Sequence, residues 1–399
     1  MTQKYYRLID LLSSVISGEW GLEPLEEGSV SIIRTTNFLN NGKINFDNTV
    51  KRFVDSGTVS KKKLQSGDVI IEKSGGSPNQ PVGRVVYFEK PDDKNYLCNN
   101  FTTILRADAR ISSKYLFYWL YYNHLIKRTL TYQNKTTGII NLQLTRYLES
   151  EKILLPSFEE QHRIVKILDL AQSLIEKRKK AIAYLDDYIK AVFLDMFGDP
   201  VSNPKGWEVN KLSKVCTKIA DGTHFSPPLV ESGIPYVTAK HLKSSGIDFF
   251  KNPTYISQEE HNKIFARCTP EKGDVLYIKD GATTGIAAIN YYDFEFSMLS
   301  SLALLKPNKN LINNHYLCHW LNNPQVKFKL LQQMAGVAIQ RFTLTKINNF
   351  TLPVPPIAEQ ENFAKIVEKT NSIQKSMQSQ LEELENNFQA ELQRAFRQD

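Results

Sequence analysis

The sequence predicts an α+β protein in which one unit, a mixed α/β block followed by a long helix, occurs twice. Several motifs recur in the same order in the two halves, and helically spaced apolar residues follow each block. Between the halves, the segment FLDMFGDPVSNPKGW (193–207) ends a helix at Gly198-Asp199-Pro200 and begins a new segment at Trp207. The predicted parts are block 1 (1–155), a central helix (156–200), block 2 (201–355) and a C-terminal helix (356–399).

The repeat rests on four pairs of motifs. ILLPSFEEQHRIVKIL (153–168) matches LPVPPIAEQENFAKIV (352–367), with Pro156 opposite Pro355 and Gln161 opposite Gln360. The other three pairs are YLFYWL (115–120) with YLCHWL (316–321), SGDVIIEKSGGS (66–77) with KGDVLYIKDGAT (272–283), and IIRTTNFLNNGKI (32–44) with YVTAKHLKSSGI (236–247). Their order is kept while the offsets drift by a few residues, as loop insertions produce. The chain restarts at its midpoint because a second copy begins there.

Within the blocks, we expect strands at GDVIIE, GRVVYF, GDVLYIKD and SSLALLK, where β-branched and aromatic residues are bounded by turn residues. Helical spacing is present in SKYLFYWLYYNHLIKRTL and NHYLCHWLNNPQVKFKLL.

The two long helices carry apolar residues at the period of a coiled coil. On the central helix this seam comprises Phe158, Val165, Leu168, Ile175, Ile182, Ile189, Phe193 and Met196, and on the C-terminal helix Phe363, Val367, Met377, Leu381, Leu384 and Phe388. We therefore expect the two helices to pack on each other. A second apolar row on the central helix, from Ile164 to Val192, is either further internal core or a surface for another protein.

Composition points to a globular protein with two basic parts. The chain has a net charge of +8, with 21 basic against 15 acidic residues in block 1 and 17 against 11 in block 2. Each block thus carries +6, whereas the central helix carries −1 and the C-terminal helix −3. Two separate basic blocks suggest two contacts with a polyanion, although a merely soluble basic protein has the same net charge.

Targeting signals and disulfide patterns are missing from the sequence. No run of 18 apolar residues or signal-peptide core occurs, and the four cysteines form no C-x-x-C pair. A reducing cytoplasm, no membrane and no structural zinc are the expectations.

Motifs for catalysis are also missing. The chain has no G-x-x-x-x-G-K-[ST] loop and no H-x-x-x-H pair. SPPL (226–229) lacks the final aromatic residue of a methyltransferase motif, and PDDK (91–94) crowds its carboxylates into what we interpret as a solvated turn. No catalytic residue, cofactor or metal is therefore predicted.

Polar loops occur in corresponding places in the two blocks. Arg, Lys, Asn and Gln bind base edges in the major groove, Thr binds phosphates, and Gly allows close approach, although such stretches are often simple turns. Because matching loops lie on two basic blocks, we predict DNA contact. The candidate residues are Arg34, Thr35, Asn37, Lys73, Ser74, Gly75, Arg84, Lys135 and Asn141 in block 1, and Thr223, His224, Lys240, His241, Lys279, Asp280, Thr283, Thr284, Gln340 and Arg341 in block 2.

Together, the junction segment, the two EEQ/AEQ helix starts and the SGDVII and KGDVLY motifs resemble the specificity (S) subunit of type I restriction-modification systems over nearly the whole chain. The resemblance implies that the blocks are target recognition domains and that the long helices form an antiparallel coiled coil. It further implies a non-catalytic subunit that binds double-stranded DNA, two methyltransferase (M) subunits and restriction (R) subunits. Block 1 departs from block 2 in lacking a start like Pro204-Lys205-Gly206-Trp207.

We therefore predict a DNA-recognition subunit that reads a bipartite, asymmetric site, one half per block, with the coiled coil setting the spacer. One alternative is a self-contained DNA methyltransferase or nuclease, whose motifs are missing here. Another is a coiled-coil scaffold that binds only proteins, which leaves the two basic blocks unexplained.

Overall fold

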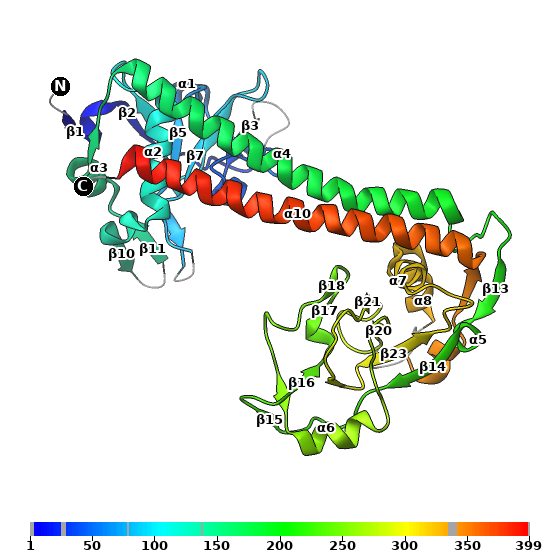
Figure 1. Ribbon diagram of the computed structural model, residues 1–399. Coiled ribbons are helices and arrows are strands. Elements are labelled where there is room, and N and C mark those ends of the chain that lie inside the picture. Colours follow the sequence, from blue (N-terminus) through cyan, green and yellow to red (C-terminus); the bar gives the residue numbers. More distant parts are fainter. Residues whose placement is uncertain (1–3, 25–28, 78–79, 137–138, 334–340, 398–399) are drawn as a thin grey trace. The chain divides into compact units, whose positions relative to one another are not determined.

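A computed structural model describes residues 4–24, 29–77, 80–136, 139–333 and 341–397. The chain forms two compact units: unit 1 comprises 1–178 and 380–399, and unit 2 comprises 179–379. Each unit contains one block and one part of each long helix, α4 (Phe158–Phe197) and α10 (Ile357–Phe396) (Figure 1).

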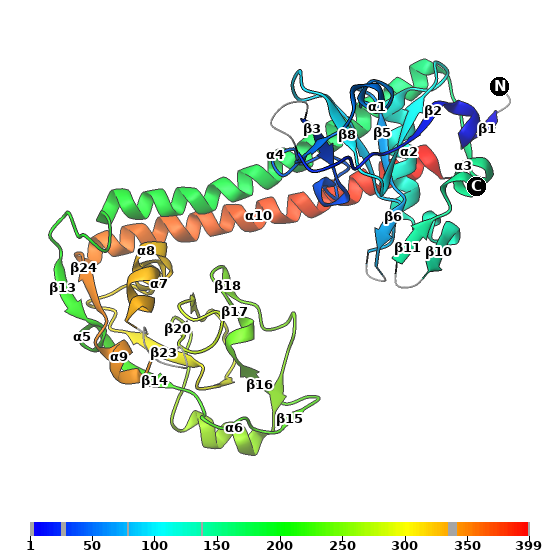
Figure 2. The same ribbon diagram turned by 180° about the vertical axis from the view of Figure 1, so that it is seen from behind.

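Block 1 is built on an antiparallel sheet of order β2-β9-β5-β7, formed by Leu12–Ser17, Thr102–Ala107, Val69–Glu72 and Val85–Tyr87. Two smaller sheets, β4-β3-β8 and β10-β11-β6, comprise Val50–Phe53, Ser29–Ile33, Tyr96–Cys98, Gln133–Thr136, Ile139–Leu142 and Ser74–Gly76. The strands β6, β10 and β11 extend together away from the main sheet (Figure 2). The α-helices are α1 (Ser56–Lys62), α2 (Ser113–Leu125) and α3 (Leu144–Ser150), and the 3-10 helices are η1 (Leu8–Leu11), η2 (Thr35–Asn37) and η3 (Arg128–Tyr132).

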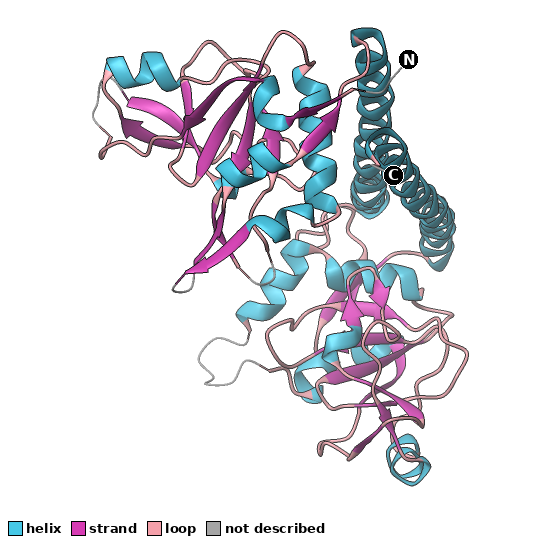
Figure 3. Ribbon diagram, turned by 90° about the vertical axis from the view of Figure 1, so that its left-hand side faces the viewer, coloured by secondary structure: helices cyan, strands magenta, loops and turns pink. Residues whose placement is uncertain are grey.

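Block 2 repeats this plan. Its main sheet has the order β14-β23-β20-β21, formed by Cys216–Asp221, Leu302–Pro307, Val275–Ile278 and Ala287–Ile289. The remaining strands are β15 (Leu229–Val230), β16 (Ile234–Val237), β17 (Leu242–Lys243), β18 (Gly246–Ile247), β19 (Tyr255–Ile256) and β22 (Ser297–Met298). The helices are α5 (Leu212–Val215), η4 (Ala239–His241), α6 (Gln258–Phe265), α7 (Asn314–Asn322), α8 (Pro324–Gln332) and α9 (Leu344–Asn348). Figure 3 shows the mixture of helices and strands, which confirms the α+β prediction.

The predicted strands and helices are present, with two refinements. The first predicted helical stretch ends as α2 at Leu125, and after Lys127, whose φ of 61° is left-handed, its last residues lie in η3. The second predicted helical stretch is divided into α7 and α8 at Pro324, which has no backbone N–H to donate. The Asn323 side chain caps the new helix by accepting from the N–H groups of Gln325 and Val326.

A short antiparallel strand pair closes each block where it meets the long helices. In block 1, β1 (Tyr5–Arg7) pairs with β12 (Lys152–Leu154). In block 2, β13 (Glu208–Lys211) pairs with β24 (Thr351–Val354). The second strand of each pair leads into α4 or α10.

The buried glutamine at the start of each long helix explains the EEQ and AEQ motifs. Gln161 and Gln360 are both fully buried. The Oε1 of Gln161 accepts from the Ser112 N–H at 2.7 Å, and that of Gln360 accepts from the Asn313 N–H at 2.8 Å. Each Nε2 donates to the carbonyl of the proline at the preceding turn, Pro156 or Pro355. Each glutamine therefore fastens its helix to the turn before α2 or α7.

The long helices pack through the predicted seam. In unit 2, Asp186 accepts a hydrogen bond from Gln374 at 3.0 Å, and Phe193 lies against Phe363 with ring centroids 5.5 Å apart. Later residues of α4 thus meet earlier residues of α10, so the pair is antiparallel. Most seam side chains are buried, although Phe158 is 45% exposed.

The end of each long helix packs on an equivalent tyrosine. Phe197, the last residue of α4, lies 4.8 Å from Tyr316 of α7, and Phe396, the last residue of α10, lies 5.2 Å from Tyr115 of α2. Each tyrosine donates its hydroxyl to a carbonyl of the strand before the other long helix, that of Pro353 or Leu154. Each unit therefore joins a block to both long helices through corresponding residues.

The junction segment ends α4 by capping it. Gly198 adopts a φ of 76°, a left-handed conformation that glycine tolerates. The indole N–H of Trp207 donates to the Phe197 carbonyl at 2.9 Å. Lys205 Nζ donates to the carbonyls of Asp195 and Met196. The P-K-G-W segment thus binds the carbonyls that the end of the helix leaves unpaired.

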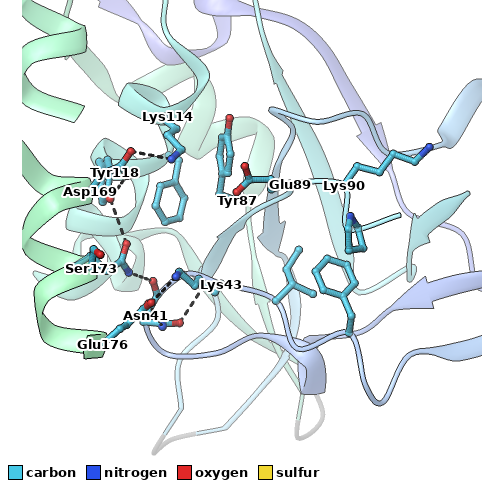
Figure 4. Close-up of a pocket in the computed structure, with 16 residues that line it drawn as sticks. Asn41, Lys43, Tyr87, Glu89, Lys90, Lys114, Tyr118, Asp169, Ser173 and Glu176 are labelled. Carbon is cyan, nitrogen blue, oxygen red and sulfur yellow. Dashed lines mark hydrogen bonds and ion pairs between the residues drawn. The ribbon is translucent and has the colours of Figure 1, made fainter. Parts of the chain in front are cut away.

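Block 1 is further joined to α4 by polar side chains that line a cleft of about 450 Å³ (Figure 4). Lys43 forms an ion pair with Glu176 at 2.6 Å, and Lys114 forms one with Asp169 at 2.8 Å. Tyr118 also donates to Asp169, at 2.7 Å. These contacts fix the block against the helix within unit 1.

Candidate nucleic-acid interface

The predicted loops converge at one edge of the main sheet in each block. Because neighbouring strands are antiparallel, the end of β2 lies beside the start of β9 and the end of β5. The same holds for β14, β23 and β20 in block 2. We call these two edges the loop edges.

The backbone frame of the loop edges is the same in both blocks. The Lys73 N–H donates to the Phe101 carbonyl and the Lys279 N–H to the Ser301 carbonyl, each at 2.9 Å. Gly18 and Gly222 end the first strand so close to the neighbouring backbone that a Cβ would lie 2.0 Å from the Asn99 oxygen or 1.8 Å from the Met298 oxygen. Both glycines are therefore required by packing.

In block 1, the structure brings together the predicted polar segments that contain Ser74 and Asn141. Ser74 of β6 and Asn141 of β11 are paired, with Ser74 Oγ 2.5 Å from Asn141 Oδ1. Lys73 is half-buried and its Nζ donates to Ser17 Oγ at 3.0 Å; burial lowers the pKa of its ammonium group. Gly75 lies exposed at the edge. These residues form a face that combines polar groups with the exposed side chain of Phe101.

Arg84 and Thr35 connect this face to η2. Nε and Nη2 of Arg84 each donate to a carboxylate oxygen of Glu72 at 2.9 Å. Nη2 also donates to the Thr35 carbonyl at 3.2 Å. Arg34 donates from Nη2 to the Asn48 carbonyl at 3.0 Å, and its side chain is half-buried. Because Arg84 is bonded to Glu72, we assign it a structural role in the predicted interface.

Asn37 and His241 occupy the same position in the repeat and cap the same turn. Asn37 accepts from the Arg34 N–H at 2.8 Å and donates to the Asn45 carbonyl at 3.1 Å. His241 Nδ1 accepts from the Thr238 N–H at 3.0 Å, and its Nε2 lies 2.9 Å from the Asn252 carbonyl. Both side chains are 1% exposed, and burial lowers the pKa of His241. We therefore revise their predicted role from base contact to turn capping.

Three more predicted contacts in block 2 are buried. Thr223 Oγ1 bonds locally to the backbone of Phe225, and Thr284 Oγ1 donates to the Gly281 carbonyl at 2.7 Å. Lys279 Nζ lies 3.3 Å from Asp221 Oδ2, and only 8% of its side chain is exposed. These side chains shape the loop edge from within and do not reach outward.

The accessible predicted residues of block 2 are Lys240, Thr283, Arg341 and His224, all exposed, with Asp280 half-exposed. The backbone bridge between Asp280 and Arg341 places two of these loops side by side. Gln340 lies outside the described residues. In block 1, the backbone of Lys135 pairs with Ile140, and its side chain lies outside the description.

Sequence reasoning missed the charged groups at the ends of the first sheet strands. Asp221, 3% exposed at its side chain, lies within 3.4 Å of His224, 3.1 Å of Arg267 and 3.3 Å of Lys279. In block 1, Lys62 and Glu19 form an ion pair of 2.8 Å next to Ser17. Aligning SGEW (17–20) with DGTH (221–224) would have been the signal, since Gly18 and Gly222 correspond.

Other chemistry is sparse. Cys98, Cys216, Cys268 and Cys318 are buried thiols, and burial raises the pKa of each. Residues 91–94 form an exposed bend in which Asp92 accepts from the Lys94 N–H, consistent with the predicted turn.

Among the described residues, no group of three His, Cys, Asp or Glu side chains is arranged to hold a metal ion. Of the helices described, none has the length and apolar character needed to cross a membrane.

Two copies of one block with equivalent loop edges, each packed on an antiparallel helix pair, define a protein with two binding domains. Residues 4–184 and 204–386 each match the family described as type I restriction modification DNA specificity domain. The chain belongs to this family. It is a specificity subunit, which is a DNA-recognition protein and not an enzyme.

Named relatives agree with this assignment, and two solved structures share the fold. The chain is 24% identical to the MjaIX specificity subunit of Methanocaldococcus jannaschii, over 72% of this chain and 68% of that protein. It is 23% identical to the StySPI specificity subunit of Salmonella potsdam, over 95% of this chain and 84% of the relative. The S subunit from M. genitalium has the same fold, with a TM-score of 0.59, 17% identity and coverage of 100% of this chain and 97% of the other. A chain solved in work on complex assembly and conformational transition of the type I R-M system gives a TM-score of 0.60 at 20% identity, covering 100% and 99% of the two chains.

Proposed function

We propose that the chain reads a bipartite, asymmetric DNA sequence, one half per block, and directs methyltransferase and restriction subunits to it. The observation that carries this proposal is the contrast within the repeat. The two blocks share buried framework contacts, such as those of Gln161 and Gln360, whereas the side chains exposed at their loop edges differ. Shared frameworks with unlike loops suit two readers of different sequences.

In block 1, the proposed reading surface comprises Lys73, Ser74, Gly75 and Asn141, with Arg34, Thr35 and Lys135 beside it. In block 2, it comprises His224, Lys240, Asp280, Thr283 and Arg341, with Gln340 on the adjoining segment. Lysine and arginine side chains can donate hydrogen bonds to guanine and to phosphate, and an asparagine side chain can form a bidentate pair with adenine. Alanine at a base contact should cost about 1–3 kcal/mol on the cognate site alone.

The helices supply the proposed surface for two M subunits. In unit 1, Leu170 and Leu174 of α4 are 61% and 43% exposed, and in unit 2, Tyr184 and Tyr188 are 68% and 51% exposed. These residues belong to or flank the second apolar row of α4. Large apolar groups on an otherwise charged helix are typical of a protein-binding surface.

The division of labour can be tested directly. The purified chain with its M partner and S-adenosylmethionine should methylate adenine in DNA, while the chain alone should transfer no methyl group. Replacing Leu170 with Ser should weaken M binding without changing DNA binding by the chain. Methyl transfer by the chain alone would show that it is itself a methyltransferase.

A further inference from the structure

We propose that one cation at each loop edge, Lys73 in block 1 and Arg267 in block 2, is held in a fixed place by a neighbouring side chain and binds one DNA phosphate. This inference rests on the proposed DNA reading and adds a residue, Arg267, that lies outside the predicted loops. It also gives Ser17 and Asp221 the role of positioning residues.

In block 2, two cations share one carboxylate. Lys279 and Arg267 both contact Asp221, at 3.3 Å and 3.1 Å. The side chain of Lys279 is 8% exposed, so its charge stays inside and neutralises Asp221. The side chain of Arg267 is 60% exposed. One guanidinium nitrogen is therefore held by Asp221 while the rest of the group faces outward, with no carboxylate of its own among these partners.

In block 1, the cation that neutralises a carboxylate and the cation with no carboxylate of its own are at exchanged positions. Lys62 comes from α1, as Arg267 comes from the segment after α6, but Lys62 is paired with Glu19 at 2.8 Å. Lys73, at the position of Lys279, donates instead to the neutral hydroxyl of Ser17 at 3.0 Å. The surplus charge of this group is thus on Lys73. In block 1, Lys62, Glu19 and Lys73 together carry +1, as Lys279, Asp221 and Arg267 do in block 2. Block 2 adds the exposed Lys218, which donates to the Arg267 carbonyl at 3.1 Å.

A phosphate fits this arrangement better than a base does. Arginine binds phosphate with several N–H groups in a planar fork, and Asp221 restrains that fork before DNA arrives. The side chain of His224 is 59% exposed and contacts the same carboxylate, with its Nε2 3.4 Å from Asp221 Oδ2. Since phosphates recur in every sequence, the two blocks can keep this contact while their reading loops differ.

Arg267→Ala tests block 2. The slope of log affinity against log salt should fall in magnitude by about 0.9, the value for one phosphate contact on duplex DNA. Cognate and unrelated duplexes should lose affinity alike, and Arg267→Lys should restore part of it. The matched control is Lys263→Ala on α6, which removes the same charge but leaves Glu259 and Glu260, its partners at 2.8 and 2.9 Å. This control should leave the slope unchanged.

Ser17→Asp tests block 1 without removing any cation. The new carboxylate should neutralise Lys73 and lower the slope by about 0.9, as Lys73→Ala should. Removing the neutral pair with Lys62→Ala and Glu19→Ala together should leave the slope unchanged. Thermal unfolding of every variant checks that it is folded.

The outcomes separate this inference from the proposed function. If the wild-type chain shows no salt-dependent DNA binding, the proposed function itself fails. If the wild type binds but Arg267→Ala and Ser17→Asp keep its slope, the phosphate sites are refuted. An equal loss with Lys263→Ala would show a general charge effect and would also refute them.

Discussion

Block 1 and block 2 agree in their interior and differ at their loop edges. Tyr115 and Tyr316 make the same carbonyl contact, and Gly18 and Gly222 make the same close backbone approach. By contrast, Ser17 is replaced by Asp221, and the exposed Phe101 by Ser301 at the equivalent backbone contact. The interior specifies the fold, and the loop edge is left to vary.

The packing of the long helices provides the largest expected difference between the units. Phe363 is fully buried and lies 5.5 Å from Phe193 and 5.4 Å from Phe197. Its counterpart at an offset of 199, Ile164, is only half-buried. Phe363→Ala should destabilise unit 2 by about 3–5 kcal/mol, the usual cost of deleting a buried phenylalanine. Ile164→Ala should cost unit 1 clearly less.

Hydrogen-exchange mass spectrometry can measure both effects, because it reports protection separately for peptides of each unit. Equal losses of protection from the two variants would show that the helix packing is the same in both units, contrary to this comparison.

The buried glutamines should, in contrast, behave alike. Gln161→Ala and Gln360→Ala each remove an acceptor from a backbone N–H, that of Ser112 or Asn313, and a donor from a proline carbonyl. Buried groups left unpaired cost about 1–3 kcal/mol. Chemical denaturation followed by hydrogen-exchange mass spectrometry should show similar losses of stability, each confined to its own unit. A large loss from only one variant would mean that the repeat is not equivalent at this position.

The smallest expected effect concerns acid sensitivity at the equivalent turn caps. Burial lowers the pKa of His241 from its ordinary value of 6.5, whereas Asn37 does not titrate. As pH falls below 6.5, the unfolded state binds a proton at this histidine more readily than the folded state does. The stability contributed by His241 is therefore present above pH 6.5 and is lost progressively below it. The loss is at most about 1.4 kcal/mol per pH unit.

Replacing the histidine with the residue of block 1 isolates this effect. Whatever His241→Asn does at pH 7.5, it should reduce the additional destabilisation between pH 7 and 5, measured by denaturant unfolding. Asn37→Ala, which introduces no titratable group, is the control and should leave the pH dependence of unit 1 as it was. An unchanged pH dependence in His241→Asn would show that folding does not lower the pKa of His241.

Much of this architecture could be predicted from the sequence because repeated motifs and helical periodicity report on buried contacts. The strands at GDVIIE and GDVLYIKD and the helices beginning at Phe158 and Ile357 follow directly from such patterns. The antiparallel packing agrees with the family resemblance. The division at Pro324 shows that proline was the stronger local signal.

The loop residues were harder to assign because a polar side chain in a turn can satisfy the protein's own backbone as well as a nucleic acid. Asn37 and His241 do the former, and sequence composition does not distinguish the two roles. Arg267 was missed for another reason. Its partner Asp221 is 46 residues away in the chain, and only folding brings them together.

The central claim is that each block reads its own half of the DNA site, and exchanging one block tests it most directly. Residues 202–355 should be replaced by the corresponding block of another family member, and DNA methylated by the chimera with its M partner should be sequenced. We expect one half of the recognised sequence to change and the other to remain. If both halves change, or neither does, the two blocks are not independent readers.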